Sequence, residues 1–386
     1  MSAAEIGVGM WGYGFMGRTH ANAYRQVRHL PGAHAARPRQ LVIGGRDGEA
    51  ARQAAATYGF ARHASDWREI VADPEVQLFD NSAWHDVHEE PCIAAAQAGK
   101  HVLCEKPLAL DADAGRRMLA AVERAGVQHM VAFNYRFAPA VRRARELIAA
   151  GQLGEVRRIH VCYFQDHQAD ASLPSPWGGR SQTGVLDGLG SHAIDLARFL
   201  VGEIESVTAD IRTFIPERGA GAGSRERIAM TEDDAFSAQV AFSAGALGVL
   251  EAAWVYAGSK NALRFEVNGS EGSLSWNLED LNHLHFNRVP SGSGDPGGTR
   301  SLLVTDRGDP YVGAWWPPGH VLGWEHLHAN LVAAFVDAIA TGEPVAPWGA
   351  TFADGLRAIE VAEAIRRSAA SGRRETVGPP SIGARS

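Results

Sequence analysis

Three glycines near the start of the chain constrain its fold more than any other feature. Gly12, Gly14 and Gly17 form a G-x-G-x-x-G array between an apolar run at residues 6–11 and a helix-compatible run at residues 18–27. This order of strand, glycine turn and helix is typical of a dinucleotide-binding unit. The first glycine permits a tight turn, the second lets the backbone approach a pyrophosphate, and the third lets helix and strand pack closely. The alternative is an ordinary glycine-rich turn.

The amides at the start of the helix after this turn have no partner within the helix, and they would bind the phosphates of a dinucleotide. We therefore predict cofactor contacts along the whole turn. The residues concerned are Gly12, Gly14, Phe15, Met16 and Gly17.

The end of the second predicted strand, residues 40–43, bears on the choice of cofactor. An acidic residue at this place usually binds the ribose 2′-hydroxyl of NAD. Here Gly45 occupies the place and Arg46 follows it. A small residue beside a cation suits the 2′-phosphate of NADP, so we favour NADP. In the alternative, Asp47 reaches the ribose and the cofactor is NAD.

Strands and helices alternate through the rest of the first third of the chain, which predicts βαβ units and a parallel sheet. We expect a doubly wound, Rossmann-type cofactor domain at residues 1–133. Its further strands are predicted at residues 76–79, 101–104 and 127–133, and its helices at residues 49–58, 66–72 and 112–125.

The remaining residues, 134–386, read as an α+β domain with a large, mainly antiparallel open sheet, because runs of strands are joined by hairpin turns. Residues 287–323 are rich in Gly, Pro and Ser and are predicted to be a long loop. Strands are expected at residues 156–164, 205–214, 235–242, 246–256, 263–267 and 272–276, and helices at residues 137–150, 191–201, 325–340 and 352–370.

Composition argues against several functional classes. The chain has 386 residues, a net charge of -7 and three scattered cysteines. An acidic balance argues against a general nucleic-acid surface, and scattered cysteines argue for small buried hydrophobes in a reducing compartment. We see no signal peptide and no apolar run long enough to span a membrane. The expected location is the cytoplasm.

Several motifs, in this order and spacing, extend the argument to a family. The chain resembles the glucose–fructose oxidoreductase / inositol dehydrogenase / MocA (Gfo/Idh/MocA) family over nearly its whole length. Three shorter segments, at residues 66–70, 132–136 and 215–218, are similar to levoglucosan-type and related glycoside dehydrogenases. The motifs that carry the family resemblance are Gly12–Gly17 with His20, Ala98–Pro107, Asn134–Arg136 and Gly190–Asp195.

The resemblance implies that Lys106, with Glu105 beside it, lies near the nicotinamide and the reacting hydroxyl, and that the peptide before Pro107 is cis. A positioned acid/base is needed because a hydroxyl proton leaves as hydride leaves carbon, and an ammonium stabilises developing negative charge. The alternative for Lys106 is a solvent-facing lysine. His192 matches the family histidine that contacts the substrate hydroxyl; its alternative is a backbone-bonded histidine at a helix start.

Two departures from the family pattern leave questions open. The family commonly has an aspartate four residues before the histidine, where this chain has Gly188, and the carboxylate lies one residue earlier, at Asp187. Either a local backbone adjustment, which glycine permits, brings Asp187 into the site, or the carboxylate is absent.

The second departure lies after the strand that ends near residue 80. Many relatives carry Thr-Pro-Asn near the nicotinamide, whereas this chain has Ala83, Trp84 and His85. We predict cofactor contacts by Ala83, Trp84 and His88, and Trp84 or His85 is a further candidate for touching the substrate.

Aromatic and polar side chains are candidates for the substrate cleft. Tyr135 and Arg136 are expected to line it, and Trp315 and Trp324 to stack on the apolar faces of a sugar ring. The alternative for each tryptophan is packing beneath the loop.

Together these features predict an NAD(P)-dependent oxidoreductase of a sugar, glycoside or cyclitol, without a catalytic metal. We expect a homodimer or homotetramer formed through the C-terminal sheet, which is an implication of the resemblance. Two alternatives remain: a glycosidase or lyase that retains its cofactor and oxidises transiently, and a non-catalytic dinucleotide-binding regulator.

Overall fold

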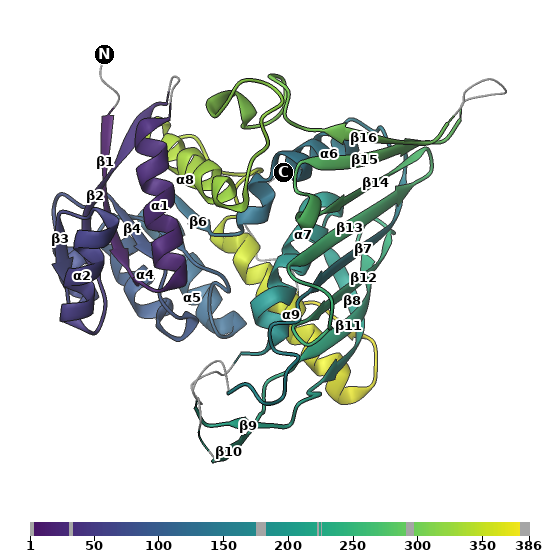
Figure 1. The fold of residues 1–386 in the computed structure, drawn as a ribbon, viewed down its shortest axis with the longest axis horizontal. Coiled ribbons are helices and arrows are strands. Elements are labelled where there is room, and N and C mark those ends of the chain that lie inside the picture. Colours follow the sequence, from purple (N-terminus) through teal and green to yellow (C-terminus); the bar gives the residue numbers. More distant parts are fainter. Residues whose placement is uncertain are drawn as a thin grey trace. The chain divides into compact units, whose positions relative to one another are not determined.

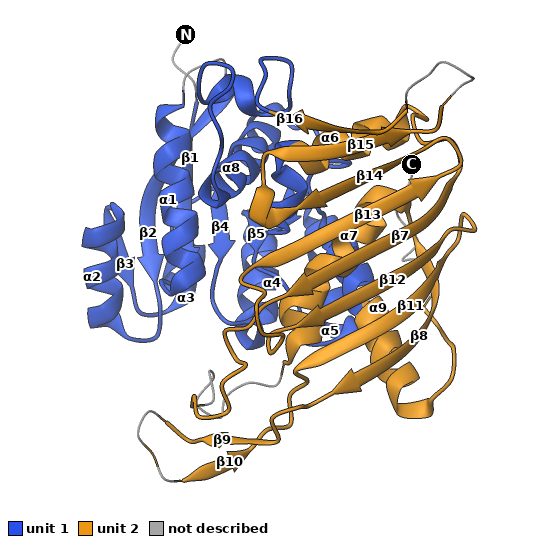
Figure 2. Cartoon of the chain, turned by 45° about the vertical axis from the view of Figure 1, so that its right-hand side comes forward, with its two compact units in different colours: residues 1–139, 305–359, 381–386 blue, residues 140–304, 360–380 orange. Residues whose placement is uncertain are grey.

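The computed structural model describes residues 4–30, 34–174, 183–221, 224, 226–290 and 297–378. It divides the chain into two compact units that interleave along the sequence (Figure 2). The first unit contains residues 1–139 and 305–359, and the second contains residues 140–304 and 360–380. The units are defined by packing, whereas the domains expected from the sequence are continuous.

The first unit is built on a six-stranded parallel sheet in the order β3-β2-β1-β4-β5-β6. The order reverses between β1 and β4, and ligands of such sheets bind at this switch point, outside the carboxyl ends of the strands. The expected doubly wound sheet is confirmed. Its strands are β1 (Ala4–Trp11), β2 (Ala36–Gly44), β3 (Arg62–Ala64), β4 (Leu78–Asn81), β5 (His101–Cys104) and β6 (His129–Val131).

Capping residues begin several helices of this unit. The Asp111 carboxylate accepts the amide of Ala114, as a helix N-cap does. The helices are α1 (Phe15–His29), α2 (Gly48–Tyr58), α3 (Trp67–Ala72), α4 (Glu89–Gln97), α5 (Ala112–Ala125) and α8 (Trp324–Thr341), with short 3-10 turns η1 (His85–Val87), η2 (Asn134–Phe137) and η5 (Val312–Ala314).

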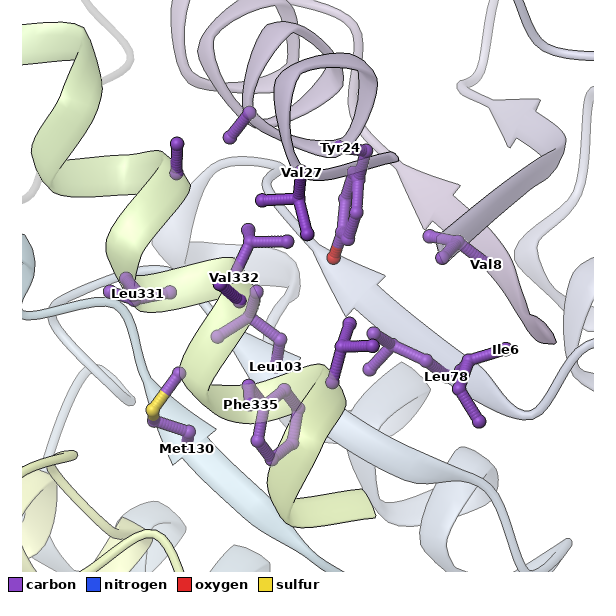
Figure 3. Close-up of a cluster of buried hydrophobic side chains, with 14 of the residues drawn as sticks. Ile6, Val8, Tyr24, Val27, Leu78, Leu103, Met130, Leu331, Val332 and Phe335 are labelled. Atoms are coloured by element: carbon purple, nitrogen blue, oxygen red, sulfur yellow. The ribbon is translucent and has the colours of Figure 1, made fainter. Parts of the chain in front are cut away.

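The core of the first unit explains why residues far along the chain return to it. Helices α1 and α8 pack side by side against the sheet (Figure 3). Leu331, Val332 and Phe335 of α8 are buried together with Tyr24 and Val27 of α1. Burying one such side chain contributes about 1.5–3 kcal/mol, so α8 is an integral part of the cofactor unit.

The second unit is built on a nine-stranded sheet in the order β16-β15-β14-β13-β7-β12-β11-β8-β17 (Figure 1). Its pairings are antiparallel except that β7 and β12 run parallel, which confirms the expected sheet type. The strands are β7 (Val156–Phe164), β8 (Ile204–Arg212), β11 (Ala235–Phe242), β12 (Leu247–Ala253), β13 (Ala262–Gly269), β14 (Gly272–Asn277), β15 (His283–Arg288), β16 (Thr299–Leu303) and β17 (Glu375–Thr376).

Part of the expected loop at residues 287–323 is a strand. Residues 299–303 form β16 and pair with β15, while residues 291–296 lie outside the described residues. A separate two-stranded ribbon consists of β9 (Glu217–Gly219) and β10 (Arg227–Ala229). The sequence pattern did not indicate β16 because only five residues pair and they are mostly exposed.

The helices of the second unit pack on one face of its sheet. Helix α7 contacts β7 and β12, whose buried side chains include Ile159 and Leu250. The helical elements are α6 (Pro139–Ala149), the π-helical turn η3 (Leu186–Gly190), α7 (Ser191–Val201) and α9 (Phe352–Ser371), which spans residues of both units.

Among the described residues, no helix combines the length and the apolar composition that a membrane span requires. The three cysteines, Cys92, Cys104 and Cys162, are free and buried. They therefore act as small core side chains, as expected.

Candidate active site

The glycine turn after β1 has one open position. Gly12 has a φ of +112°, and a Cβ there would lie 2.6 Å from the backbone of Ser82 and Ala83. A Cβ on Gly17 would lie 2.3 Å from the Gly12 carbonyl oxygen. By contrast, no atom lies within 4 Å of a Cβ added to Gly14. The first and third glycines are required by the packing of the chain itself, and the second leaves space above the turn.

This open turn meets the start of a helix. No side chain caps α1, which begins at Phe15 after the N-cap residue Gly14. The amides of the first helical turn are therefore available to an anion, with the positive end of the helix dipole behind them. Turn and helix start together fit the pyrophosphate of a dinucleotide.

The end of β2 has no room for a side chain at Gly45. A Cβ there would lie 2.2 Å from the Tyr13 ring. The Asp47 carboxylate caps α2, accepting the amides of Glu49 and Ala50 at 3.0 Å each. The exposed Arg46 lies between Gly45 and this cap. The cation is thus placed at the strand end, and the nearby carboxylate is engaged by the helix.

The segment after β4 carries an exposed indole ring at Trp84 and a buried imidazole ring at His88. Trp84 is 57% exposed, and its ring lies edge-on to His85. His88 is buried, with Nδ1 3.0 Å from the Pro107 carbonyl oxygen and Nε2 3.2 Å from the Ala83 carbonyl oxygen. Burial lowers the pKa of His88. His88 therefore joins the loops that follow β4 and β5.

Lys106 follows the end of β5. Its backbone amide donates to Glu105 Oε2 at 3.0 Å, and the Glu105 amide donates to the Asn81 carbonyl at 2.9 Å. The Lys106–Pro107 peptide is cis. Lys106 and the glycine turn thus both lie at the carboxyl edge of the parallel sheet, where such folds bind their ligands.

A buried network of charged side chains lies behind Lys106. His20 Nδ1 is 2.9 Å from Asp80 Oδ2, and His20 Nε2 is 3.0 Å from Glu105 Oε1. The Tyr24 hydroxyl donates to Asp80 Oδ2 at 2.9 Å. Burial alone would lower the pKa of His20, but the charge and hydrogen bonds of Asp80 and Glu105 outweigh it and raise the pKa to about 10. His20 is therefore an imidazolium.

The sequence motif included His20, but it did not indicate that His20 pairs with Asp80 and Glu105. The same interactions act on the carboxyl group: burial alone would raise the pKa of Glu105, but the hydrogen bond with His20 holds it below its usual value. Asp80 lies near the end of β4 and Glu105 directly after β5, and these two parallel strands are neighbours in the sheet. Two acidic residues at neighbouring strand ends were the signal that could have revealed the network.

Trp324, the first residue of α8, links the glycine turn to Tyr135. Its ring stacks on Phe15, with centroids 5.9 Å apart, and its Nε1–H donates to the Tyr135 hydroxyl at 3.4 Å. Tyr135 is buried, as is Arg136, whose Nη2 lies 3.3 Å from Asp354 Oδ1. The structure brings together Phe15, Tyr135 and Trp324.

Trp315 is packed against other side chains of the first unit. Its Nε1–H donates to Asn330 Oδ1 at 2.8 Å, its ring lies edge-on to His326, and it packs against the buried core of the first unit. This arrangement corresponds to the packing alternative that the sequence left open for this residue.

His192 belongs to the second unit, where it is the second residue of α7 and is buried. Its ring lies edge-on to Tyr163, with centroids 5.9 Å apart. The Tyr163 hydroxyl donates to Asn261 Oδ1 at 2.8 Å. The ring is thus packed at the helix start against a side chain that is itself fixed.

The backbone before His192 forms a π-turn over Leu186–Gly190. Such a turn contains one residue more than a regular α-turn and often occurs at functional sites. Asp187, five residues before His192, consequently takes the angular position that Gly188 would have in a regular α-helix. A π-turn is one form of local backbone adjustment, and the place of Asp187 in the site stays a prediction.

The Asp187 carboxylate is ion-paired. Its Oδ2 accepts a hydrogen bond from Arg366 of α9, within the same unit. Asp233 lies beside this pair and accepts the Leu186 amide at 2.7 Å. Burial, with a further contribution from the charge of Asp187, raises the pKa of Asp233 to about 6.

No group of three or more His, Cys, Asp or Glu side chains in the described ranges is arranged to hold a metal ion. The expectation of a reaction without a metal stays a prediction.

Comparisons with known proteins match both parts of the chain. Residues 6–133 match the profile of an oxidoreductase family with an NAD-binding Rossmann fold, and residues 141–275 match the Gfo/Idh/MocA C-terminal domain. Levoglucosan dehydrogenase of Pseudarthrobacter phenanthrenivorans is 35% identical over 95% of this chain and 96% of its own. Inositol 2-dehydrogenase of Rhizobium meliloti is 28% identical over 96% of this chain and 98% of its own.

Solved structures give the same result. A levoglucosan dehydrogenase in complex with NADH and L-sorbose has a TM-score of 0.92 and 36% sequence identity, covering 97% of this chain and 99% of its own.

Proposed function

The chain belongs to the Gfo/Idh/MocA family of NAD-binding oxidoreductases, and we propose that it oxidises one ring hydroxyl of a sugar, glycoside or cyclitol with NADP. The observation that carries this proposal is Lys106 at the carboxyl edge of the parallel sheet, in the same unit as a glycine turn that is open at Gly14. A bound nicotinamide cofactor would supply the hydride acceptor for this oxidation.

Lys106 is the proposed proton-transfer residue. In the oxidation, the neutral amine of Lys106 accepts the hydroxyl proton as the C–H bond breaks and the C=O bond forms. The resulting ammonium ion stays close to the new carbonyl oxygen. In the reverse direction the ammonium donates that proton and stabilises the developing alkoxide.

His192 and Asp187 are proposed as the hydroxyl-binding pair of the second unit. The π-turn supports this assignment, because it gives Asp187 the angular position of the residue four before the histidine. Arg366 pairs with this carboxylate and so holds it in place. Tyr135 and Trp324 are the proposed sugar-facing residues of the first unit, because Trp324 joins the glycine turn to the Tyr135 hydroxyl.

The preference for NADP rests on the end of β2. An acidic side chain at position 45 would collide with Tyr13, and Arg46 supplies a cation beside the strand end. The Asp47 carboxylate already caps α2, so it is a poor candidate for binding a ribose.

The proposed substrate class is a cyclic polyol, because relatives named for levoglucosan and for inositol both match the chain. The test is a panel that contains levoglucosan, L-sorbose, myo-inositol and simple glycosides, each supplied with NAD or NADP. We expect net reduction of the cofactor with at least one ring substrate. Cleavage of a glycoside without net cofactor reduction would contradict a dehydrogenase and favour the cofactor-retaining alternative.

A pair of arginine variants tests the cofactor. Arg46→Ala should raise the KM for NADP about tenfold or more and leave the KM for NAD unchanged, because an ion pair to a phosphate is lost. Arg52→Ala, which removes an exposed arginine of α2 paired with Glu49, is the control and should change neither value. A KM for NADP that Arg46→Ala leaves unchanged would contradict the preference.

A further inference from the structure

The proposed reaction leaves a buried group of charged side chains in the first unit without a role. His20 of α1 lies between Asp80 of β4 and Glu105, which follows β5, and all three side chains are shielded from solvent. The network therefore joins α1, β4 and the turn that follows β5. A buried charge is costly unless it is paired, so its position beside the reactive lysine calls for a reason.

The hydrogen bonds define the charge of the network. A neutral imidazole donates from one ring nitrogen only, whereas both nitrogens of His20 lie against carboxylate oxygens. His20 therefore carries a positive charge between two negative ones, and the three groups together carry one negative charge.

The neighbouring side chains Tyr24 and His328 do not change the net charge of this network. Tyr24 donates its hydroxyl hydrogen to Asp80, and burial and the charge of Asp80 raise the pKa of Tyr24 well above its usual value. The ring of His328 is 6.1 Å from that of His20, and burial with the His20 charge lowers the pKa of His328 to about 3, so His328 is neutral. The charge of Lys106 acts on Glu105 and helps to lower the pKa of that carboxyl.

Glu105 carries the network to the lysine. One carboxylate oxygen pairs with His20, and the other accepts the backbone amide of Lys106. The Glu105 amide is bound to the Asn81 carbonyl of the neighbouring strand. The carboxylate is thus held at both ends, and it fixes the peptide from which the lysine side chain extends.

We propose that His20 is a positioning residue for Lys106: it holds Glu105 in the orientation that fixes the lysine backbone, and it neutralises one of the two carboxylates behind the lysine. The inference deepens the proposed function and rests on it for the role of Lys106. Loss of His20 leaves an additional negative charge near the lysine, which stabilises the ammonium form and raises the pH at which the lysine becomes a base.

The composition of the chain makes this testable, because it contains three lysines in all: Lys100, Lys106 and Lys260. Protein grown on ε-¹³C-lysine therefore gives three NMR signals, and Lys106→Arg identifies one of them. Lys100 Nζ is 2.8 Å from the Asp73 carbonyl oxygen and Lys260 Nζ is 2.7 Å from Asp166 Oδ2, so both serve as internal references.

We expect His20→Gln to raise the titration midpoint of the Lys106 signal by about one pH unit, the size expected for removing a nearby unit charge. Glu105→Gln, which removes a negative charge instead, should lower the midpoint. Tyr24→Phe removes a hydrogen bond to the same Asp80 carboxylate but no charge, and it should leave the midpoint within about 0.2 of the wild-type value. If His20→Gln does not fold, the downward shift of the Lys106 midpoint in Glu105→Gln tests whether the charges of the network act on Lys106.

Activity gives a second readout. With a substrate found in the panel, His20→Gln should lower kcat about tenfold or more, while the KM for the cofactor changes less than about threefold. A folded His20→Gln protein with an unmoved Lys106 midpoint and an unchanged kcat would overturn the proposal, as would a Glu105→Gln midpoint that does not fall. The NMR titration needs no substrate, so the proposed dehydrogenase activity can fail while the positioning role of His20 holds.

Discussion

Lys106 and His192 are the two candidate groups for the chemistry, and they are supported in different ways within their own units. The network behind Lys106 is buried, and its hydrogen bonds join α1 with the ends of β4 and β5. The support of the His192 segment is a π-turn and an ion pair in which Arg366 is 39% and Asp187 13% exposed. The network behind Lys106 consists of buried ion pairs, whereas the His192 segment is held by an irregular turn and a partly exposed ion pair.

This difference has an energetic consequence. Removing one partner of a buried ion pair leaves an uncompensated charge, which costs far more than losing an exposed pair. The first unit therefore cannot lose one member of its network without a large loss of stability, whereas we expect the second unit to tolerate changes at its partly exposed pair.

The largest expected effect concerns the buried network. Asp80→Asn should lower the free energy of unfolding by about 3–5 kcal/mol, because the buried His20 cation loses one of its two carboxylate partners. Chemical denaturation at neutral pH measures this change. A loss below about 1 kcal/mol would place the network in the same class as the exposed pairs, and would remove the contrast between the two regions.

The pH dependence of stability should show two separate windows. The pKa of Asp233 is 3.8 in the unfolded chain and about 6 in the folded one, so its stabilising contribution is lost as pH rises from about 4 to 6. A pKa difference of this size corresponds to about 3 kcal/mol. Denaturation midpoints measured from pH 4 to 6 should flatten in Asp233→Asn, and an unchanged slope would contradict the assignment.

The second window belongs to His20. Its pKa is 6.5 in the unfolded chain and about 10 in the folded one, so the contribution of His20 is complete below pH 6.5 and is lost as pH rises through 10. The same denaturation series, extended to alkaline pH, should lose this slope in His20→Gln and keep it in Asp233→Asn.

A smaller effect on catalysis tests the π-turn. Asp187→Asn should lower kcat/KM about tenfold, the cost of a weakened charge-assisted hydrogen bond to substrate. The matched control is Asp210→Asn, which changes an exposed aspartate of β8 in the same unit. Equal kinetics for the two variants would support the other reading, in which the site lacks this carboxylate.

The smallest expected effect concerns the ion pair itself. Arg366→Met keeps the aliphatic part of the side chain and removes the charge, and it should lower the free energy of unfolding by less than about 1 kcal/mol. Thermal and chemical denaturation would measure it. A loss as large as that of Asp80→Asn would show that exposure does not separate the two regions.

Local sequence patterns predicted much of this architecture. The glycine array with its flanking apolar run predicted β1 and α1, and the helix at residues 191–201 and the strands at residues 156–164 and 235–242 have the predicted bounds. In each case neighbouring residues decide the structure. The return of α8 to the first unit could not be predicted in this way, because an apolar helix face does not specify its partner.

The same limit applies to the candidate site. The motifs identified Lys106 and Tyr135, but His20, Asp80 and Glu105 are far apart in sequence and meet only through the order of the strands. Nor did the sequence reveal that Arg136 pairs with Asp354, because a buried ion pair has no periodic signature.

The most direct test of the account is the single-turnover rate of hydride transfer in Lys106→Ala, measured with cofactor and substrate saturating. Lys100→Ala, whose Nζ contacts a backbone carbonyl away from this motif, is the matched control. The account predicts a rate about 10²–10⁴ times lower for Lys106→Ala, the range of a lost acid/base group, with cofactor affinity little changed and the control at the wild-type rate. An undiminished rate in Lys106→Ala would contradict it.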